Sequence, residues 1–172
     1  MPAERIGALI GKNGRIKRGI ETKTKTTISV RGSEVVISGD AYNSWIAKSI
    51  VEAIAIGFDY NKAVCLMNDN YTMEVIPLHA KGSRKECIKG RIIGKGGATK
   101  DIIEKTGNCF ISVFDDVVGV IGEYDDVANT AYAINMLISG SSHGAAYNYL
   151  ERKRSERKNT FFGCDWEYRN KE

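Results

Sequence analysis

The sequence contains one pattern twice, and this internal repeat constrains the fold more than any other feature. Residues Ala8–Gly14 are Ala-Leu-Ile-Gly-Lys-Asn-Gly, and residues Arg91–Gly97 are Arg-Ile-Ile-Gly-Lys-Gly-Gly. The offset from Gly11 to Gly94, which is 83 residues, also aligns Ile28-Ser29-Val30 with Ile111-Ser112-Val113 without a gap. A repeat of this length indicates two copies of one structural unit, so the 172 residues are predicted to form two small domains.

Hydrophobic periodicity and turn residues predict similar elements in both copies. In the first copy we expect helices at Arg5–Ile10, Arg15–Thr24 and Ala41–Ile56, and strands at Thr26–Val30 and Glu34–Ser38. The last of these helices is predicted to have an apolar face formed by Trp45, Ile46, Ile50, Val51 and Ile54. An opening strand should be missing or very short, because only four residues precede Arg5.

The second copy is predicted to add a strand in front and to follow the order β-α-α-β-β-α. It should begin with a strand at Tyr71–Leu78 and a basic loop at Lys81–Lys89, and Gly90–Ile93 should lead into the glycine loop. A helix is then expected at Ala98–Thr106, ended by Gly107. Strands at Asn108–Val113 and Val117–Ile121 and a helix at Asp125–Ser139 should complete the copy. A short helix at Asp59–Asn68 should bridge the copies, and a basic helix is expected at Ala145–Lys158. The aromatic stretch Phe161–Tyr168 has no clear period. The predicted domains are therefore residues 1–58, a bridge at 59–70, residues 71–140, and a C-terminal helix and tail at 141–172.

The repeated glycine loop has the properties of a phosphate-binding site. Glycine can adopt positive φ and has no Cβ, so a phosphate can approach the main chain closely. The helix that follows each loop directs its N-terminal N–H groups and the positive end of its dipole toward such a group. Lys12 and Lys95 add a mobile positive charge, and Ile10 and Ile93 offer an apolar surface to bases. The pattern therefore predicts a grip on a nucleic-acid backbone.

Positive charge is concentrated around these loops. Residues 1–25 hold seven basic and two acidic residues, residues 81–105 hold eight and three, and residues 145–158 hold five and two. Clustering that recurs with the repeat favours nucleic-acid binding over a merely solvated lysine face. The expected RNA-binding residues are Gly11, Lys12, Asn13, Gly14, Arg15, Lys17, Lys89, Arg91, Ile93, Gly94, Lys95, Gly96, Gly97 and Lys100. Arg152, Lys153 and Arg154 could either contact phosphates or only hydrate a helix.

Other site types fit the sequence poorly. A nucleotide-hydrolysing loop needs Gly-Lys-Ser/Thr after a strand, whereas Gly97 is followed by Ala98 and Thr99. The four cysteines form no CxxC pair and there are only two histidines, so no metal or other cofactor is expected. No nucleophile pair is suggested by spacing, so an enzyme is not expected. His143 follows two serines, and we expect Ser141 or Ser142 to cap a helix there.

The string Ile-Gly-x-x-Gly, followed by a helix and Ile-Ser-Val, resembles the KH domain in its eukaryotic-type order. This resemblance implies two tandem KH domains of α+β class packed together, with a GxxG loop that clamps about four nucleotides of single-stranded RNA. It covers most of residues 1–140.

A narrower resemblance rests on Gly57-Phe58-Asp59, Lys89–Gly97, the segment Gly140–Gly144 and the string Tyr147-x-Tyr149-Leu150-Glu151-Arg152-Lys153-Arg154. These segments are similar to the archaeal members of the ribosome-assembly KH family, whose eukaryotic members are the partners of the Nob nuclease. The resemblance implies binding to the 3′ region of small-subunit ribosomal RNA during maturation. It also implies contact with the nuclease that trims this end and with the alpha subunit of initiation factor two.

Two further expectations follow. No apolar run approaches 18 residues and no signal peptide is apparent, so a cytoplasmic protein with reduced thiols is expected. A KH module used for protein docking remains the rival interpretation, with the first copy as the candidate because its opening strand is lost.

Overall fold

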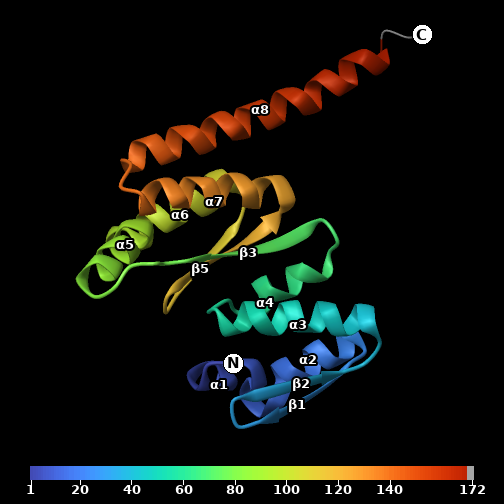
Figure 1. The fold of residues 1–172 in the computed structure, drawn as a ribbon. Helices are drawn as coiled ribbons and strands as arrows, with labels where there is room; N and C mark the ends of the chain where they lie inside the picture. Colours follow the sequence, from blue (N-terminus) through green and yellow to red (C-terminus); the bar gives the residue numbers. More distant parts are fainter. Residues whose placement is uncertain (170–172) are drawn as a thin grey trace. The chain divides into compact units, whose positions relative to one another are not determined.

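The computed structural model describes the backbone of residues 1–169 and the side chains of residues 1–157. Its contacts divide the chain into two compact units, which do not coincide with the two sequence repeats. One unit consists of Met1–His79 and Phe110–Tyr124, and the other consists of Ala80–Cys109 and the chain from Asp125 onward. The first unit thus combines the whole first copy with the strands of the second copy (Figure 1).

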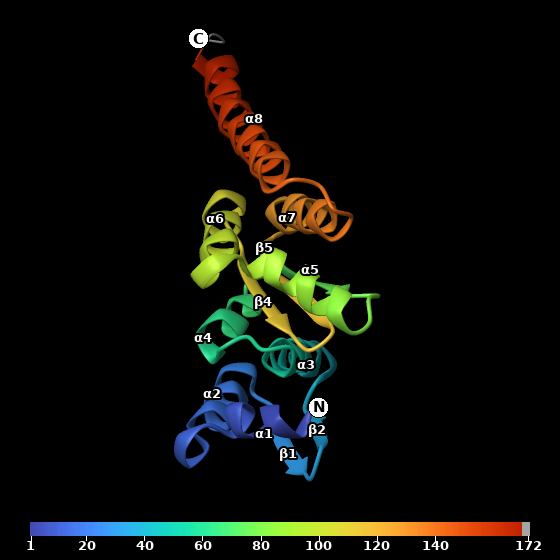
Figure 2. The same cartoon turned by 90° about the vertical axis from the view of Figure 1, so that its left-hand side faces the viewer.

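The first copy forms three helices on a two-stranded hairpin. Helices α1 (Ala3–Ile10), α2 (Arg15–Thr24) and α3 (Ala41–Ala55) contact one another, while α2 contacts β1 (Thr27–Arg31) and α3 contacts β2 (Glu34–Ser38). The short 3-10 helix η1 (Lys12–Gly14) joins α1 to α2 (Figure 2). Among the described residues no strand precedes α1.

The second sheet belongs to the same compact unit. Strands β3 (Tyr71–Pro77), β5 (Val117–Glu123) and β4 (Phe110–Phe114) pair antiparallel in the order β3-β5-β4. Ile121 shares one hydrophobic core with Leu9, Ile20 and the buried face of α3. The bridge, formed by α4 (Tyr60–Ala63) and η2 (Val64–Met67), contacts α3, β3 and β5.

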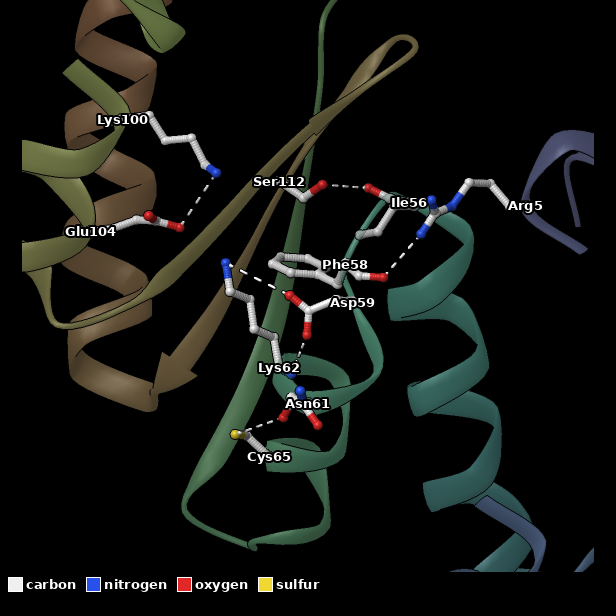
Figure 3. Close-up of polar contacts among 10 residues, drawn as sticks. All are labelled: Arg5, Ile56, Phe58, Asp59, Asn61, Lys62, Cys65, Lys100, Glu104 and Ser112. Carbon is white, nitrogen blue, oxygen red and sulfur yellow. Dashed lines mark hydrogen bonds and ion pairs between the residues drawn. The ribbon is translucent and has the colours of Figure 1, made fainter. Parts of the chain in front are cut away.

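Polar contacts at the end of α3 join it to α1 and to the second sheet (Figure 3). Arg5 donates from Nε to the carbonyl of Ile54 at 2.8 Å and from Nη2 to the carbonyl of Phe58 at 3.0 Å. Ser112 on β4 donates to the carbonyl of Ile56 at 2.9 Å. Gly119 on β5 has no room for a side chain, because a Cβ there would lie 2.7 Å from the Phe58 ring. The close approach of backbone to ring explains the glycine in a strand interior.

The second unit is helical. Helices α5 (Ser83–Ile93) and α6 (Ala98–Gly107) flank η3 (Lys95–Gly97), and α7 (Tyr124–Ile138) begins at the last residue of the first unit. Helix α8 (His143–Arg169) contacts α6 and buries Ala146 and Leu150. Tyr149 packs on Tyr132 of α7, with ring centroids 4.7 Å apart, and donates to Asn129 at 3.1 Å. No helix in residues 1–169 is both long and apolar enough to span a bilayer.

Most predicted elements are present, but three details of the prediction are wrong. Lys81–Lys89 is not a loop, because most of it forms the first turns of α5. Gly107 does not end its helix in a left-handed conformation; Asn108 does so with φ 52°, while Gly107 lies against Thr130, whose Oγ1 would be 2.2 Å from an added Cβ. Trp45 is not on the buried face of α3 and is 64% exposed. The side chains of Phe161–Tyr168 lie outside the described residues.

Candidate nucleic-acid interface

The two glycine loops have the same backbone conformation. In the first loop Gly11 has φ 69° and ψ 177°, and in the second Gly94 has φ 74° and ψ 175°. Asn13 and Gly96 both lie in the left-handed region, with φ 54° and 62°. Each loop is closed by the same two hydrogen bonds, from Gly11 to Gly7 and from Gly14 to Gly11 in the first copy, and from Gly94 to Gly90 and from Gly97 to Gly94 in the second. The sequence repeat is therefore a repeat of shape.

The first glycine of each loop is required by its surroundings. A Cβ on Gly11 would lie 2.7 Å from Cγ1 of Ile16. A Cβ on Gly94 would lie 2.3 Å from Oγ1 of Thr99 and 2.7 Å from its backbone nitrogen. Contacts under 3 Å do not occur for real Cβ atoms, so each loop must press its backbone onto the first turn of the following helix. This contact fixes the position of the loop relative to that helix.

Each helix that follows a loop presents an uncapped N-terminus. No side chain of the described residues caps α2 or α6, whose N-cap residues are Gly14 and Gly97. The N–H groups of the first helical residues, Arg15 and Ala98, bond to the carbonyls of Lys12 and Lys95 within the loops, and the positive end of each helix dipole lies beside its loop. Lys12, Arg15 and Lys95 are exposed beside these ends. This combination suits an anion such as a backbone phosphate.

An apolar side chain borders each loop. Ile10 is 36% exposed at the end of α1, and Ile93 is 37% exposed at the end of α5. Exposed isoleucines at equivalent positions of two copies are consistent with surfaces on which bases can lie. The role of Ile93 in RNA binding stays a prediction.

Four of the predicted cations are engaged in structural contacts. Lys17 pairs with Glu21 at 3.5 Å, and Lys100 pairs with Glu104 at 3.8 Å in the equivalent place (Figure 3). Lys89 pairs with Glu86 at 3.3 Å. Arg91 donates from Nη2 to the carbonyl of Ser141 at 2.5 Å, and its own carbonyl lies 2.9 Å from Nε2 of His143.

These contacts assign two kinds of role to the basic residues. Arg91 and His143 join the end of α5 to the turn before α8, where Ser142 caps the helix by accepting from Ala145 at 3.2 Å. The predicted serine cap is thereby confirmed. The roles of Arg91, Lys89, Lys17 and Lys100 in RNA binding stay predictions. Lys12, Arg15 and Lys95 are exposed and are the better candidates for phosphate contact.

The cations of α8 are also distributed between contacts and solvent. Arg152 and Lys153 both pair with Glu156, at 3.7 Å and 2.8 Å, and Arg152 lies over the ring of Tyr149. Arg154 is exposed. Surface pairs of this kind contribute little to stability, so they leave these side chains able to rearrange toward a phosphate.

Sequence reasoning missed Arg18. Its guanidinium donates to the carbonyl of Asn13 and, at 3.4 Å, to the carbonyl of Gly14, so it ties down the acceptors of the first loop. The equivalent residue of the second copy is Asp101, in the first turn of α6. Its sequence position could have indicated this contact, because a side chain four residues after Gly14 lies one helical turn further along and faces the loop.

The described residues contain no group of three or more His, Cys, Asp or Glu side chains that could hold a metal ion. Cys109 is buried against Thr130, and burial raises the pKa of its thiol to about 12. That thiol is therefore neutral at physiological pH and is not an activated nucleophile.

Comparison with known proteins agrees with this geometry. A model described as eukaryotic type KH-domain (KH-domain type I) matches residues 3–70 and again residues 71–155. A KH domain-containing protein of Methanocaldococcus jannaschii is 35% identical over 171 residues, covering 94% of this chain and 75% of that protein. The pre-rRNA-processing protein pno1 of Schizosaccharomyces pombe is 31% identical over 113 residues, which cover 63% of this chain but 47% of the relative. The chain thus spans less than half of that eukaryotic relative.

Solved structures share the fold over nearly the whole chain. A protein of unknown function from Aeropyrum pernix aligns with a TM-score of 0.90 and 32% identity, covering 96% of this chain and 94% of that one. Dim2p from Pyrococcus horikoshii aligns with a TM-score of 0.82 and 37% identity, covering 88% and 95%. A third structure, of an a/eIF2alpha-aDim2p-rRNA complex from the same organism, contains a chain that aligns with a TM-score of 0.84 and 36% identity, covering 91% and 92%. Matched twice by the type I KH model and along its length by these relatives, the chain belongs to the eukaryotic-type KH-domain family, among its archaeal Pno1-like members.

Proposed function

We propose that this protein is a non-catalytic, single-stranded RNA-binding factor whose two glycine loops grip phosphates of one RNA. The observation that carries the proposal is the identical conformation of the two loops, each pressed onto a helix N-terminus that no described side chain caps. Because such a loop is already ordered, binding costs little conformational entropy there, and most of its attraction to the phosphate contributes to the affinity. The chemistry requires no proton transfer and no metal.

We further propose that the RNA is the 3′ region of small-subunit ribosomal RNA during maturation. The names of the relatives support ribosomal RNA as the target: one is a pre-rRNA-processing protein, and another was solved in a complex with rRNA and a/eIF2alpha. The choice of the small-subunit 3′ region rests on the family resemblance of the sequence. The same complex supports the alpha subunit of initiation factor two as a proposed protein partner. The nuclease that trims the rRNA 3′ end is proposed as a second partner from the family resemblance of the sequence.

The two loops are expected to contribute differently. The first turn after the first loop carries Arg15, Lys17 and Arg18, whereas the equivalent turn of the second copy carries Lys100 and Asp101. Coulomb attraction to a phosphate should therefore be stronger at the first loop. The second loop contains one more glycine and leaves more room for a phosphate to approach its main chain, since nothing lies within 4 Å of a Cβ added to Gly96 or Gly97.

Charge reversal in each loop tests the proposal. Lys95→Asp with Gly96→Asp, and separately Lys12→Asp with Asn13→Asp, should each weaken binding to an RNA with the rRNA 3′-end sequence by roughly tenfold or more, because like charge replaces attraction. Aspartate is tolerated at position 96, because Asn13 adopts the same conformation with φ 54°. Affinity is measured by fluorescence anisotropy and folding by circular dichroism.

The matched control is Lys48→Asp with Ser49→Asp on α3, which changes the net charge by as much as the second-loop variant but belongs to neither loop. It should bind RNA as the unmodified protein does. A duplex of the same sequence should bind much more weakly than the single strand, because a KH groove holds unpaired bases. Folded loop variants with unchanged affinity would refute the proposed function, and a control variant that loses as much affinity would show only a nonspecific charge effect.

A further inference from the structure

Helix α2 has an open hollow on its exposed side. The hollow has a volume of about 510 Å³, and one face of the helix lines it: Arg15, Arg18, Gly19, Thr22 and Lys23. These residues follow the three- and four-residue spacing that brings helical side chains together. Lys17 and Glu21, which pair with each other at 3.5 Å, do not line it. The hollow is therefore separate from the ion pair on the same helix.

Gly19 leaves space at the centre of this face. Glycine inside a helix costs stability relative to alanine, so its presence needs a structural reason. A Cβ at this position would lie 2.7 Å from the hydroxyl oxygen of Tyr60 on α4. The packing of Tyr60 against the helix thus requires the glycine, and the missing side chain leaves room between the surrounding cations.

The positive charge of the hollow is not neutralised by the protein, because no acidic side chain lines it. Arg15 and Lys23 are exposed and form no ion pair with another described residue. Arg18 donates to the carbonyls of Asn13 and Gly14, which carry no net charge. Like charges on one helix face repel one another. An anion in the hollow would offset this repulsion.

The helix dipole adds to the unfavourable electrostatics. The first turn of α2 contains Arg15 and no acidic residue, although the positive end of the dipole favours acidic side chains there. The second copy has Asp101 in the first turn of α6. The offset of 83 residues aligns the hollow with five residues that together carry no net charge: Ala98, Asp101, Ile102, Lys105 and Thr106. A departure from local preference in one copy alone is typical of a functional site.

We propose that the hollow on α2 is a second phosphate site, which holds the RNA phosphate next to the one gripped by the first glycine loop. The ligand follows from continuity with that loop, because Arg18 lines the hollow and also holds the loop carbonyls. The cations and the hydroxyl of Thr22 are donors of the kind that contact phosphates in nucleic-acid complexes. From Arg15 to Lys23 the helix rises about 12 Å, which extends the site beyond the loop. This proposal rests on the proposed function and gives the first copy a longer phosphate path than the second.

The variant Arg15→Gln with Lys23→Gln tests the hollow and leaves the loop sequence intact. Its affinity for an RNA with the rRNA 3′-end sequence, measured by fluorescence anisotropy, should fall roughly fivefold or more, because charge-assisted contacts are lost. Arg15→Lys with Lys23→Arg keeps both charges and should bind within about threefold of the unmodified protein. The Tm of the free glutamine variant should change little, because Arg15 opposes the helix dipole and Lys23, in the last turn, complements it.

A methylphosphonate scan locates the phosphate. Each RNA in the scan has one linkage in which a methyl group replaces the charged oxygen, with a 2′-deoxy sugar there for chemical stability. The reference RNA has the same deoxy sugar and a normal phosphate, so a loss of affinity marks a phosphate that the protein contacts. One linkage should matter to the unmodified protein and not to the glutamine variant. It should adjoin a linkage that loses its effect in the variant Lys12→Asp with Asn13→Asp.

The outcomes distinguish this proposal from the proposed function. A loop variant that loses affinity beside a glutamine variant that keeps it would overturn the second site alone. Unchanged affinity in both folded variants would overturn the second site and the proposed function together. A glutamine variant that binds weakly but responds to the same linkages as the unmodified protein would show an indirect effect and would also overturn the second site. An equal loss in the charge-conserving control would do the same.

Discussion

Gly94→Ala is the substitution for which the structure gives the sharpest expectation. Gly94 has φ 74° and ψ 175°, a region that is essentially restricted to glycine. A methyl group there would also lie 2.7 Å from the backbone nitrogen of Thr99, which cannot move without displacing the first turn of α6. Gly96→Ala two residues later is the matched control, because Gly96 has φ 62° and nothing lies within 4 Å of an added Cβ.

The magnitudes of the two substitutions separate clearly. Backbone strain in the glycine-only region costs about 1–3 kcal/mol, and overlap with fixed atoms adds about 1–3 kcal/mol, so Gly94→Ala should cost about 4 kcal/mol of unfolding free energy. Gly96→Ala incurs only the left-handed penalty of about 1 kcal/mol. For a chain of this size these values correspond to a lowering of Tm by about 10 °C and about 3 °C.

Thermal unfolding followed by circular dichroism measures both Tm shifts. Titration of the folded variants with RNA at low temperature measures how each substitution changes the RNA affinity. Gly94→Ala should weaken RNA binding because the loop can no longer press onto α6, whereas Gly96→Ala should retain most of the affinity. Gly11→Ala should be milder than Gly94→Ala, because the close contacts in that loop are with the Ile16 side chain, which can move. Equal Tm values for Gly94→Ala and Gly96→Ala would refute the argument that the first loop glycine is fixed by steric contact.

Three other outcomes are expected. In a protein that also carries Lys95→Asp, Arg18→Gln should weaken RNA binding a few fold and leave the structure intact, because the first loop loses the donor that holds its carbonyls. An unchanged affinity would show that Arg18 is not part of the site. The logarithm of the affinity for single-stranded RNA should fall with the logarithm of the salt concentration at a slope of about −3 to −4, and a slope near zero would contradict phosphate contact. The variant Lys95→Asp with Gly96→Asp should make this slope shallower by at least about 0.7. Burial raises the pKa of the Cys109 thiol to about 12 and keeps it neutral, so alkylation at pH 8 should modify exposed Cys87 and spare Cys109; equal labelling by mass spectrometry would contradict the burial. Because this pKa is raised by folding, its contribution to the free energy of unfolding should be complete below pH about 9 and be lost as the pH rises toward 12.

The repeat made most of the fold predictable from sequence. Helix Arg15–Thr24 and strand Glu34–Ser38 have the predicted bounds, because β-branched runs and an i, i+4 isoleucine pair are strong local signals. The start of α5 was not predicted, since its first turns are charged and Ile88 is their first buried side chain. The repeat contained the missing information, because the same offset aligns α1 with the last eight residues of α5.

The site was predictable in its backbone and less so in its side chains. Glycine spacing determines the loop conformation locally, so both loops were identified from sequence. Which cations remain free depends on tertiary partners: Arg91 is held by the turn at Ser141, and Lys89 by Glu86. Trp45 was assigned to the core because helical periodicity marks a face but does not tell whether another element covers it.

The two sequence copies and the two compact units have different boundaries, and this limits how the protein can be divided. A fragment that begins at Tyr71 would contain a complete KH sequence, but it would expose Ile121 and leave Gly119 without the Phe58 ring that covers it. A sheet uncovered in this way presents apolar surface to solvent and is prone to aggregate. The second copy is therefore not a portable module. Exchanging the second copy for another KH domain would therefore also require replacing the surface that the first copy packs against.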